Sequence, residues 1–220
     1  MKKIKAIIFD MDGVMFDTEK LYTKAFLSIT KKMGFETKVS EEFINSLKGV
    51  KKEKIKTRFK SLLGQDFDFD RLLKEVLDYI DTYIENKGMP IKDGLLELLQ
   101  YAKENNLKTA IGTSEKTHRV KNYLEKAHLA ADNFDAIVTG DMVENGKPAP
   151  DIFLEACKAI SINPDEAIIL EDAPNGIIAA HRAGAKPVMV IDCIQPTEEI
   201  KKKLFTKPLN SLKEVQGIIK

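Results

Sequence analysis

The chain has 220 residues and a formal net charge of +1, with 43% hydrophobic and 31% charged residues. A chain of this length can bury a substantial core and can also carry a smaller inserted unit. The nearly balanced charge gives no reason to expect a polyanionic partner, so we expect no binding to nucleic acid.

Two features of the sequence bear on where the protein works. The amino terminus places lysines before an apolar run that is too short for a signal peptide or a membrane span. Cys157 and Cys193 lie far apart and lack the spacing of metal ligands. We therefore expect a cytoplasmic protein with no membrane partner, in which both cysteines are reduced and structural.

The first predicted element is a strand over residues 6–9. The run Ala6-Ile7-Ile8-Phe9 is apolar, partly β-branched, and ends abruptly in acids and a glycine. A strand of this kind is typical of a parallel sheet that is buried on both faces.

The stretch from about residue 14 to about residue 90 has successive helical patterns and no convincing buried strand. Its lysines, including Lys48 and Lys51, are balanced by nearby acids and are not interleaved with aromatic residues, which favours a solvated helix face. Residues 66–70, alternating Asp and Phe, are expected to be a loop and a helix cap. We predict a helical domain over residues 15–90, inserted into a core of residues 1–14 and 91–220.

Beyond residue 90, strand patterns alternate with amphipathic helical patterns. This alternation, with short connections and right-handed crossovers, predicts an α/β fold with a doubly wound, Rossmann-like parallel sheet. Ligands of such a sheet bind at the carboxyl ends of its strands. The predicted strands are 108–112, 136–138, 167–170 and 188–191, and the predicted helices are 94–102, 119–127, 152–160 and 177–183.

Two acids, Asp10 and Asp12, stand at the end of the first predicted strand. Side chains two apart on an extended backbone project to the same side, so both carboxylates point into one space. Their repulsion is costly unless a cation, a shared proton or a lysine offsets it. An acidic turn that caps a helix is the alternative interpretation, and these residues alone do not decide between the two.

Three further polar stretches follow other predicted strands, at places that a parallel sheet would bring to the same edge. Gly112-Thr113-Ser114 could bind phosphate with its hydroxyls and with the free amides of a helix start. Gly146-Lys147-Pro148-Ala149-Pro150 holds a lysine in a stiff loop, where it could offset negative charge. Glu171 and Asp172 end an apolar strand, and with Asp10 they would offer the oxygen ligands that magnesium prefers. The site lacks nearby His or Cys, which argues against zinc.

These four stretches resemble the four signature motifs of the haloacid dehalogenase superfamily, in the family's order and with a helical insert after the first. The matching stretches are Asp10-Met11-Asp12-Gly13-Val14, Thr113-Ser114, Lys147-Pro148 and Glu171-Asp172. Three more are similar to the β-phosphoglucomutase-like subgroup and its sugar-phosphate phosphatases: Asp17-Thr18-Glu19, Leu47-Lys48-Gly49-Val50 and Glu171-Asp172-Ala173-Pro174-Asn175-Gly176.

The resemblance implies a Mg²⁺-dependent phosphatase that acts on a small phosphorylated metabolite, of the sugar phosphate or nucleoside monophosphate type. Asp10 is the implied nucleophile, which forms an aspartyl-phosphate, and Asp12 is the implied general acid and base. Because dehalogenating relatives do not carry this second acid, Asp12 favours phosphate esters over haloacids.

The resemblance also implies the residues that bind metal and phosphate. The magnesium ligands would be Asp10, the backbone carbonyl of Asp12, Asp172 and, directly or through water, Glu171. Lys147 would be a catalytic residue that neutralises charge. The implied phosphate-binding residues are Gly13, Thr113 and Ser114.

The insert would act as a mobile cap that reads the leaving group, with Glu19, Tyr22 and Lys52 as the implied substrate contacts. Tyr22 replaces a histidine that is expected in the sugar-phosphate mutases, and Lys52 replaces an arginine. Losing the imidazole and the guanidinium weakens the mutase interpretation, so a phosphatase is favoured. The alternative interpretation makes Tyr22 a packed helix residue and Lys52 a solvent lysine.

Three other functions stay open at this point. A β-phosphoglucomutase-type phosphomutase would share every core residue. A non-catalytic regulatory module that binds phosphate or metal would have little use for Asp12. Phosphonate cleavage would need a cap lysine that forms a Schiff base. We expect a monomer in each case.

Overall fold

The computed structural model describes residues 3–47, 50 and 52–219. The chain divides into unit 1, Met1–Asp17 with Met89–Lys220, and unit 2, Thr18–Gly88. The predicted insert, residues 15–90, is three residues longer at its start and two at its end than unit 2. Lys48 and Gly49 of the predicted Leu47–Val50 motif lie outside the described residues, as does Lys51.

Unit 1 is built on one five-stranded sheet in which every pairing is parallel. The strand order is β3-β2-β1-β4-β5, with β1 in the centre. This confirms the predicted doubly wound parallel sheet. The strands are β1 (Ala6–Phe9), β2 (Lys108–Gly112), β3 (Ala136–Val138), β4 (Ala167–Glu171) and β5 (Lys186–Met189).

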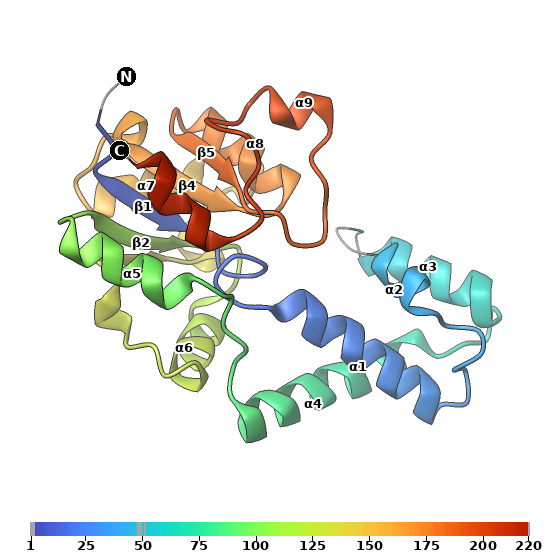
Figure 1. Ribbon diagram of the computed structural model, residues 1–220. Coiled ribbons are helices and arrows are strands. Elements are labelled where there is room, and N and C mark those ends of the chain that lie inside the picture. Colours follow the sequence, from blue (N-terminus) through green and yellow to red (C-terminus); the bar gives the residue numbers. More distant parts are fainter. Residues whose placement is uncertain (1–2, 48–49, 51, 220) are drawn as a thin grey trace. The chain divides into compact units, whose positions relative to one another are not determined.

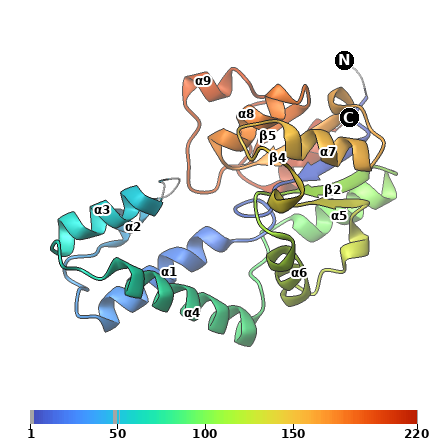
Figure 2. The same cartoon turned by 180° about the vertical axis from the view of Figure 1, so that it is seen from behind.

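Helices cover both faces of this sheet (Figures 1 and 2). One face carries α7 and α8, and the other carries α5, which also contacts η4 near the carboxyl terminus. The helices of unit 1 are α5 (Leu95–Glu104), α6 (Thr117–Lys126), α7 (Asp151–Ala159), α8 (Pro174–Arg182) and α9 (Glu198–Lys201). Short 3₁₀ turns are η1 (Ala131–Asn133), η2 (Gly140–Met142), η3 (Pro164–Glu166) and η4 (Leu212–Ile218).

The central strand is buried on both sides, as its apolar sequence predicts. All four residues of β1 have no exposed surface. Ile8 lies opposite Ala110 of β2 and Ile169 of β4, and these three pack with apolar residues of α7 and α8 into one cluster. Two-sided burial therefore fixes β1 in the sheet and places its last residues at the carboxyl edge.

Some elements differ from the predictions, and for physical reasons. β5 begins two residues before the predicted start at residue 188, and its pairing with β4 ends where Glu171 lies opposite Met189. Val190 instead makes an isolated bridge with Leu209. α8 begins three residues before the predicted start at residue 177, because Pro174 suits the first turn of a helix. The lysine-rich stretch that was predicted to be a solvated helix face forms α3, for which the sequence analysis gave no bounds, and α2, α9 and η4 were not predicted.

The described residues of unit 2 form four helices and the turns that connect them, with no strand. Phe59 has no exposed surface and lies at the centre of an aromatic cluster, with ring contacts to Phe26, Phe43, Phe67 and Phe69. The Asp68 side chain accepts a hydrogen bond from the Arg71 amide, which confirms the predicted cap of the last helix. The helices are α1 (Thr18–Lys32), α2 (Glu41–Asn45), α3 (Lys52–Leu63) and α4 (Phe69–Lys87). Across the described parts of both units, no helix combines the length and apolar character that a membrane crossing requires.

The two segments of unit 1 that connect it to unit 2 are hydrogen-bonded to each other. Phe16 is fully buried and forms an antiparallel bridge with Ile91, and the Asp17 amide donates to the Pro90 carbonyl over 2.9 Å. Next along the chain, the Lys92 ammonium lies 2.5 Å from Asp192 Oδ1 and 3.9 Å from Asp17 Oδ1. Lys92 lies in the segment that returns from unit 2, and it contacts both the segment that enters unit 2 and the segment that follows β5.

We expect Lys92→Met to destabilise the protein by about 3 kcal/mol, because the Asp192 side chain, only 4% exposed, would lose its cation. Lys213→Met is the matched control, since Lys213 pairs with Asp93, whose side chain is 77% exposed, and its loss should matter far less. Urea unfolding followed by circular dichroism measures both variants. Equal shifts of the unfolding midpoint would contradict a structural role for the Lys92 pair.

Candidate active site

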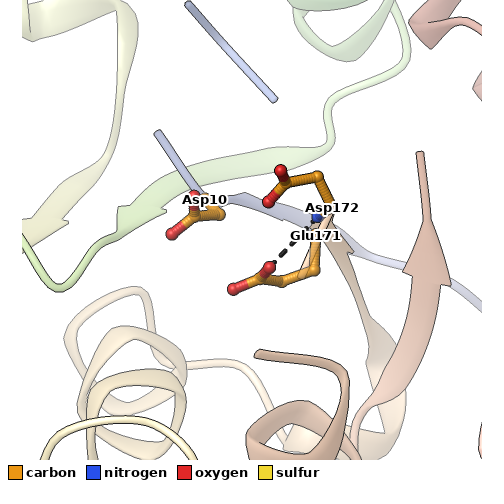
Figure 3. Close-up of side chains that lie close together, drawn as sticks. All are labelled: Asp10, Glu171 and Asp172. Carbon is orange, nitrogen blue, oxygen red and sulfur yellow. Dashed lines mark hydrogen bonds between the residues drawn. The ribbon is translucent and has the colours of Figure 1, made fainter. Parts of the chain in front are cut away.

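Three carboxylates meet at the carboxyl edge of the sheet (Figure 3). Asp10 follows β1, Glu171 ends β4, and Asp172 comes next. One oxygen from each side chain lies within 4.8 Å of the others. Each residue is less than a tenth exposed, at 7%, 2% and 9% in that order. The sheet thus gathers negative charge where water cannot fully solvate it.

Lys147 is the cation of this cluster, and its side chain is 7% exposed. Its ammonium donates to Asp10 Oδ1, to Glu171 Oε1 over 2.7 Å and to the Gly112 carbonyl over 3.0 Å. The same ammonium lies 4.6 Å from the centroid of the Phe153 ring on α7. Lys147 therefore bridges the carboxyl ends of β1, β2 and β4, and the Phe153 ring adds a cation–π contact.

Glu171 has partners for both of its carboxylate oxygens. Oε1 accepts from Lys147, and Oε2 accepts from the amides of Asp172 and Ala173, each over 3.1 Å. These contacts hold the Glu171 carboxylate beside Lys147.

Burial and nearby charges together set the pKa of Asp10. Burial raises the pKa of Asp10, Lys147 lowers it, and the charges of Glu171 and Asp12 raise it again, so that it stands at about 8. Burial would lower the pKa of Lys147, but the carboxylates of Asp10 and Glu171 raise it well above the ordinary lysine value. One ammonium thus faces more than one carboxylate, which leaves the pKa of Asp10 above the ordinary value of an aspartate.

The donor set fits a hard divalent cation. The three side chains offer carboxylate oxygens, the ligands that Mg²⁺ prefers, and within the described residues this cluster contains no histidine or cysteine. A bound cation would offset the charge that raises the pKa of Asp10. It would thereby stabilise the ionised form of this carboxylate.

Two glycines leave room for the carboxylates of the cluster. Gly13 has φ +78°, a left-handed conformation, and a Cβ there would collide with the Asp172 carboxylate. A Cβ at Gly176 in α8 would collide with Glu171 in the same way. Gly13, which was predicted to bind phosphate, therefore lies close to the Asp172 carboxylate.

Thr113 and Ser114 follow β2 but differ in their surroundings. The Thr113 side chain is buried, and its hydroxyl accepts from the Glu115 amide over 3.1 Å. Ser114 is exposed. Neither residue caps α6, which begins at Thr117. Because Ser114 is exposed and Thr113 is buried, the Ser114 hydroxyl is the one better placed to reach a ligand.

The remaining predicted residues divide between the two units. Asp12 is half-buried, and its charge acts on Asp10. Glu19, Tyr22 and Lys52 all lie in unit 2, where they line one cavity together. Sequence reasoning missed the Gly112 carbonyl and the Phe153 ring as supports of Lys147, because neither a backbone carbonyl nor an apolar helix residue leaves a signal of its own.

Comparison with known proteins identifies relatives over most of the chain. The family model described as haloacid dehalogenase-like hydrolase matches residues 7–190. A phosphorylated carbohydrates phosphatase of Thermotoga maritima is 29% identical over 186 residues, which cover 84% of each chain. The protein SUPPRESSOR OF QUENCHING 1, chloroplastic, of Arabidopsis thaliana is 33% identical over 199 residues, or 86% of this chain. The match spans only 18% of that longer plant protein.

Among solved structures, β-phosphoglucomutase from Clostridium difficile matches with a TM-score of 0.66 and 29% sequence identity. The match covers 96% of this chain and 93% of the other.

We expect the affinity for Mg²⁺ to rise with pH up to about 8 and then to level off. Below the raised pKa of Asp10 a cation must displace its proton, which weakens binding by up to tenfold for each pH unit. Isothermal titration calorimetry between pH 6 and pH 9 measures this dependence. Asp10→Asn should bind more weakly and lose the dependence, whereas an affinity of the native protein that is constant from pH 6 to pH 8 would contradict it.

Proposed function

This chain belongs to the haloacid dehalogenase-like hydrolase family, and we propose from that premise that it is a Mg²⁺-dependent phosphatase of a small phosphorylated metabolite. The observation that carries the proposal is the buried Asp10, held by Lys147 beside Glu171 and Asp172. The named phosphatase activity of the Thermotoga maritima relative supports the same reaction class.

In the proposed first step, a carboxylate oxygen of Asp10 attacks the phosphorus of the ester. A bond forms between this oxygen and phosphorus while the bond from phosphorus to the leaving oxygen breaks. Asp12 gives its proton to the leaving alkoxide, which departs as a neutral alcohol. The product on the protein is an aspartyl-phosphate on Asp10.

In the second step, water attacks the phosphorus of the aspartyl-phosphate. Asp12, now ionised, takes a proton from the water, and the bond between phosphorus and the Asp10 oxygen breaks. Inorganic phosphate leaves, and both carboxyl groups return to their starting states. Atoms and charges therefore balance over the cycle with water as the only co-reactant.

The other residues of the cluster supply position and charge. Lys147 neutralises the equatorial phosphate oxygens, and Ser114, Thr113 and the backbone at Gly13 hold them in place. Asp10, the Asp12 carbonyl and Asp172 would hold Mg²⁺, with Glu171 acting through water. When bound, the ion supplies positive charge that keeps Asp10 ionised and polarises the phosphate.

We further propose that unit 2 is the cap of this enzyme. The chain passes between the units at two places only, Asp17 to Thr18 and Gly88 to Met89. Two neighbouring connections of this kind favour a hinge. Closure of the cap would then keep water away from the aspartyl-phosphate until the alcohol has left. Glu19, Tyr22 and Lys52 would then contact the leaving group.

Asp10→Asn should abolish phosphate release, and Asp12→Asn should slow it by about 10²–10⁴-fold, the usual contribution of a positioned acid and base. Release of inorganic phosphate from sugar phosphates and nucleoside monophosphates is measured with Mg²⁺ and again with EDTA, which should stop turnover.

Asp132→Asn, an exposed acid of the same unit, is the control and should keep native activity. Turnover by Asp10→Asn at the native rate would refute the assigned nucleophile. Formation of a phosphate isomer without net release of phosphate would favour a phosphomutase instead.

A further inference from the structure

Unit 2 contains a cavity of about 340 Å³, within the range of small-molecule sites. Its walls come from all four helices of the unit and from the segment before α3. Most of the lining is apolar and includes Phe26, Ile44, Ile55, Phe69 and Leu73. Such a lining favours an occupant that has an apolar surface of its own.

The aromatic cluster behind the cavity gives it a firm wall. Phe26 and Phe69 line the cavity, and both pack on the fully buried Phe59, with ring centroids 5.7 and 5.5 Å away. Because Phe59 also contacts Phe43 and Phe67, neither wall ring can move without disturbing the core of unit 2. The cavity is therefore a built feature of the fold.

Other apolar lining residues are not fully covered by protein. Val50, Ile55 and Leu73 are only half-buried, although each lines the concave cavity. A ligand that covered them would gain the free energy of removing apolar surface from water.

The charged groups of the lining balance each other. Among the described residues Lys52 and Glu19 are the only charged ones that line the cavity, and they carry one charge of each sign. Thr23 directs its hydroxyl to the Glu19 carbonyl over 2.9 Å. A second phosphate would need an excess of cations, which the described part of the lining does not offer, whereas Lys52, Glu19 and Tyr22 can pair with the hydroxyls or ring heteroatoms of an uncharged group.

We propose that this cavity receives the leaving group of the substrate, and that the substrates are monophosphates of alcohols that carry an uncharged ring with an apolar face, as nucleoside 5′-monophosphates do. The inference rests on the proposed phosphatase function. Chain connectivity supports it, because Glu19 and Tyr22 follow Asp17 by two and five residues, where the chain leaves unit 1.

Two substrates that share the reacting group test this inference. Uridine 5′-monophosphate and ribose 5-phosphate are both primary-alcohol monophosphates, but only the first carries a base. We expect kcat/KM for uridine 5′-monophosphate to be at least about tenfold higher, from burial of the base against the apolar lining. A bisphosphate such as glucose 1,6-bisphosphate should be a poorer substrate than glucose 6-phosphate.

Leu73→Ser should reduce the ratio of kcat/KM for uridine 5′-monophosphate to kcat/KM for ribose 5-phosphate to about threefold or less, because it puts a hydroxyl into the apolar wall. Leu77→Ser is the matched control: Leu77 lies one turn later on α4, is 37% exposed and does not line the cavity, so it should keep the native ratio. If Leu73→Ser fails to fold, Ile55→Ser with the control Leu62→Ser, both on α3, makes the same test.

The outcomes separate the two proposals. Equal or faster turnover of ribose 5-phosphate, or a ratio that Leu73→Ser and Leu77→Ser change equally, would overturn the assignment of the cavity and leave the phosphatase proposal standing. No release of phosphate from either substrate or from para-nitrophenyl phosphate would overturn the proposed function, and the inference with it.

Discussion

The ammonium of Lys147 between the carboxylates of Asp10 and Glu171 is the contact on which the rest of the site depends. A buried lysine is costly to ionise, and so is a buried carboxylate, but each offsets the cost of the other. Here one cation serves more than one acid, so the balance is incomplete and burial keeps the pKa of Asp10 at about 8. A further positive charge at this edge of the sheet would therefore be stabilising.

The parallel sheet is what makes such a cluster possible. Phe9 lies opposite Ile111 on one side and Leu170 on the other, so the next residues along β1, β2 and β4 emerge side by side. Two-sided apolar burial fixes this register, since a slip would move apolar side chains out of the core. The energy that holds Asp10 near Glu171 therefore comes from the core below them, not from the acids themselves.

The positions of Asp10, Glu171 and Gly112 at one edge could be predicted from where the apolar strands end. The strand order and the reach of Lys147 could not, because they depend on how helices pack and on a loop without a repeating pattern. α3 shows another limit: Phe59 is its single buried residue, so the lysine-rich helix has little apolar periodicity to read. The cavity of unit 2 was equally hidden, since its walls come from four helices that are separated in sequence.

The two units carry different kinds of surface, and this difference bears on how such an enzyme can change its substrate. The site in unit 1 is charged, and its pKa values depend on Asp10, Lys147 and Glu171, all within that unit. The cavity in unit 2 is mostly apolar, and its described lining carries one charge of each sign. Under the proposed function, a substitution in the cavity alters the binding of the leaving group without altering the charge balance at Asp10. If the proposed function is correct, the chemistry and the selectivity depend on separate cores, and either can change while the other keeps the geometry that it needs.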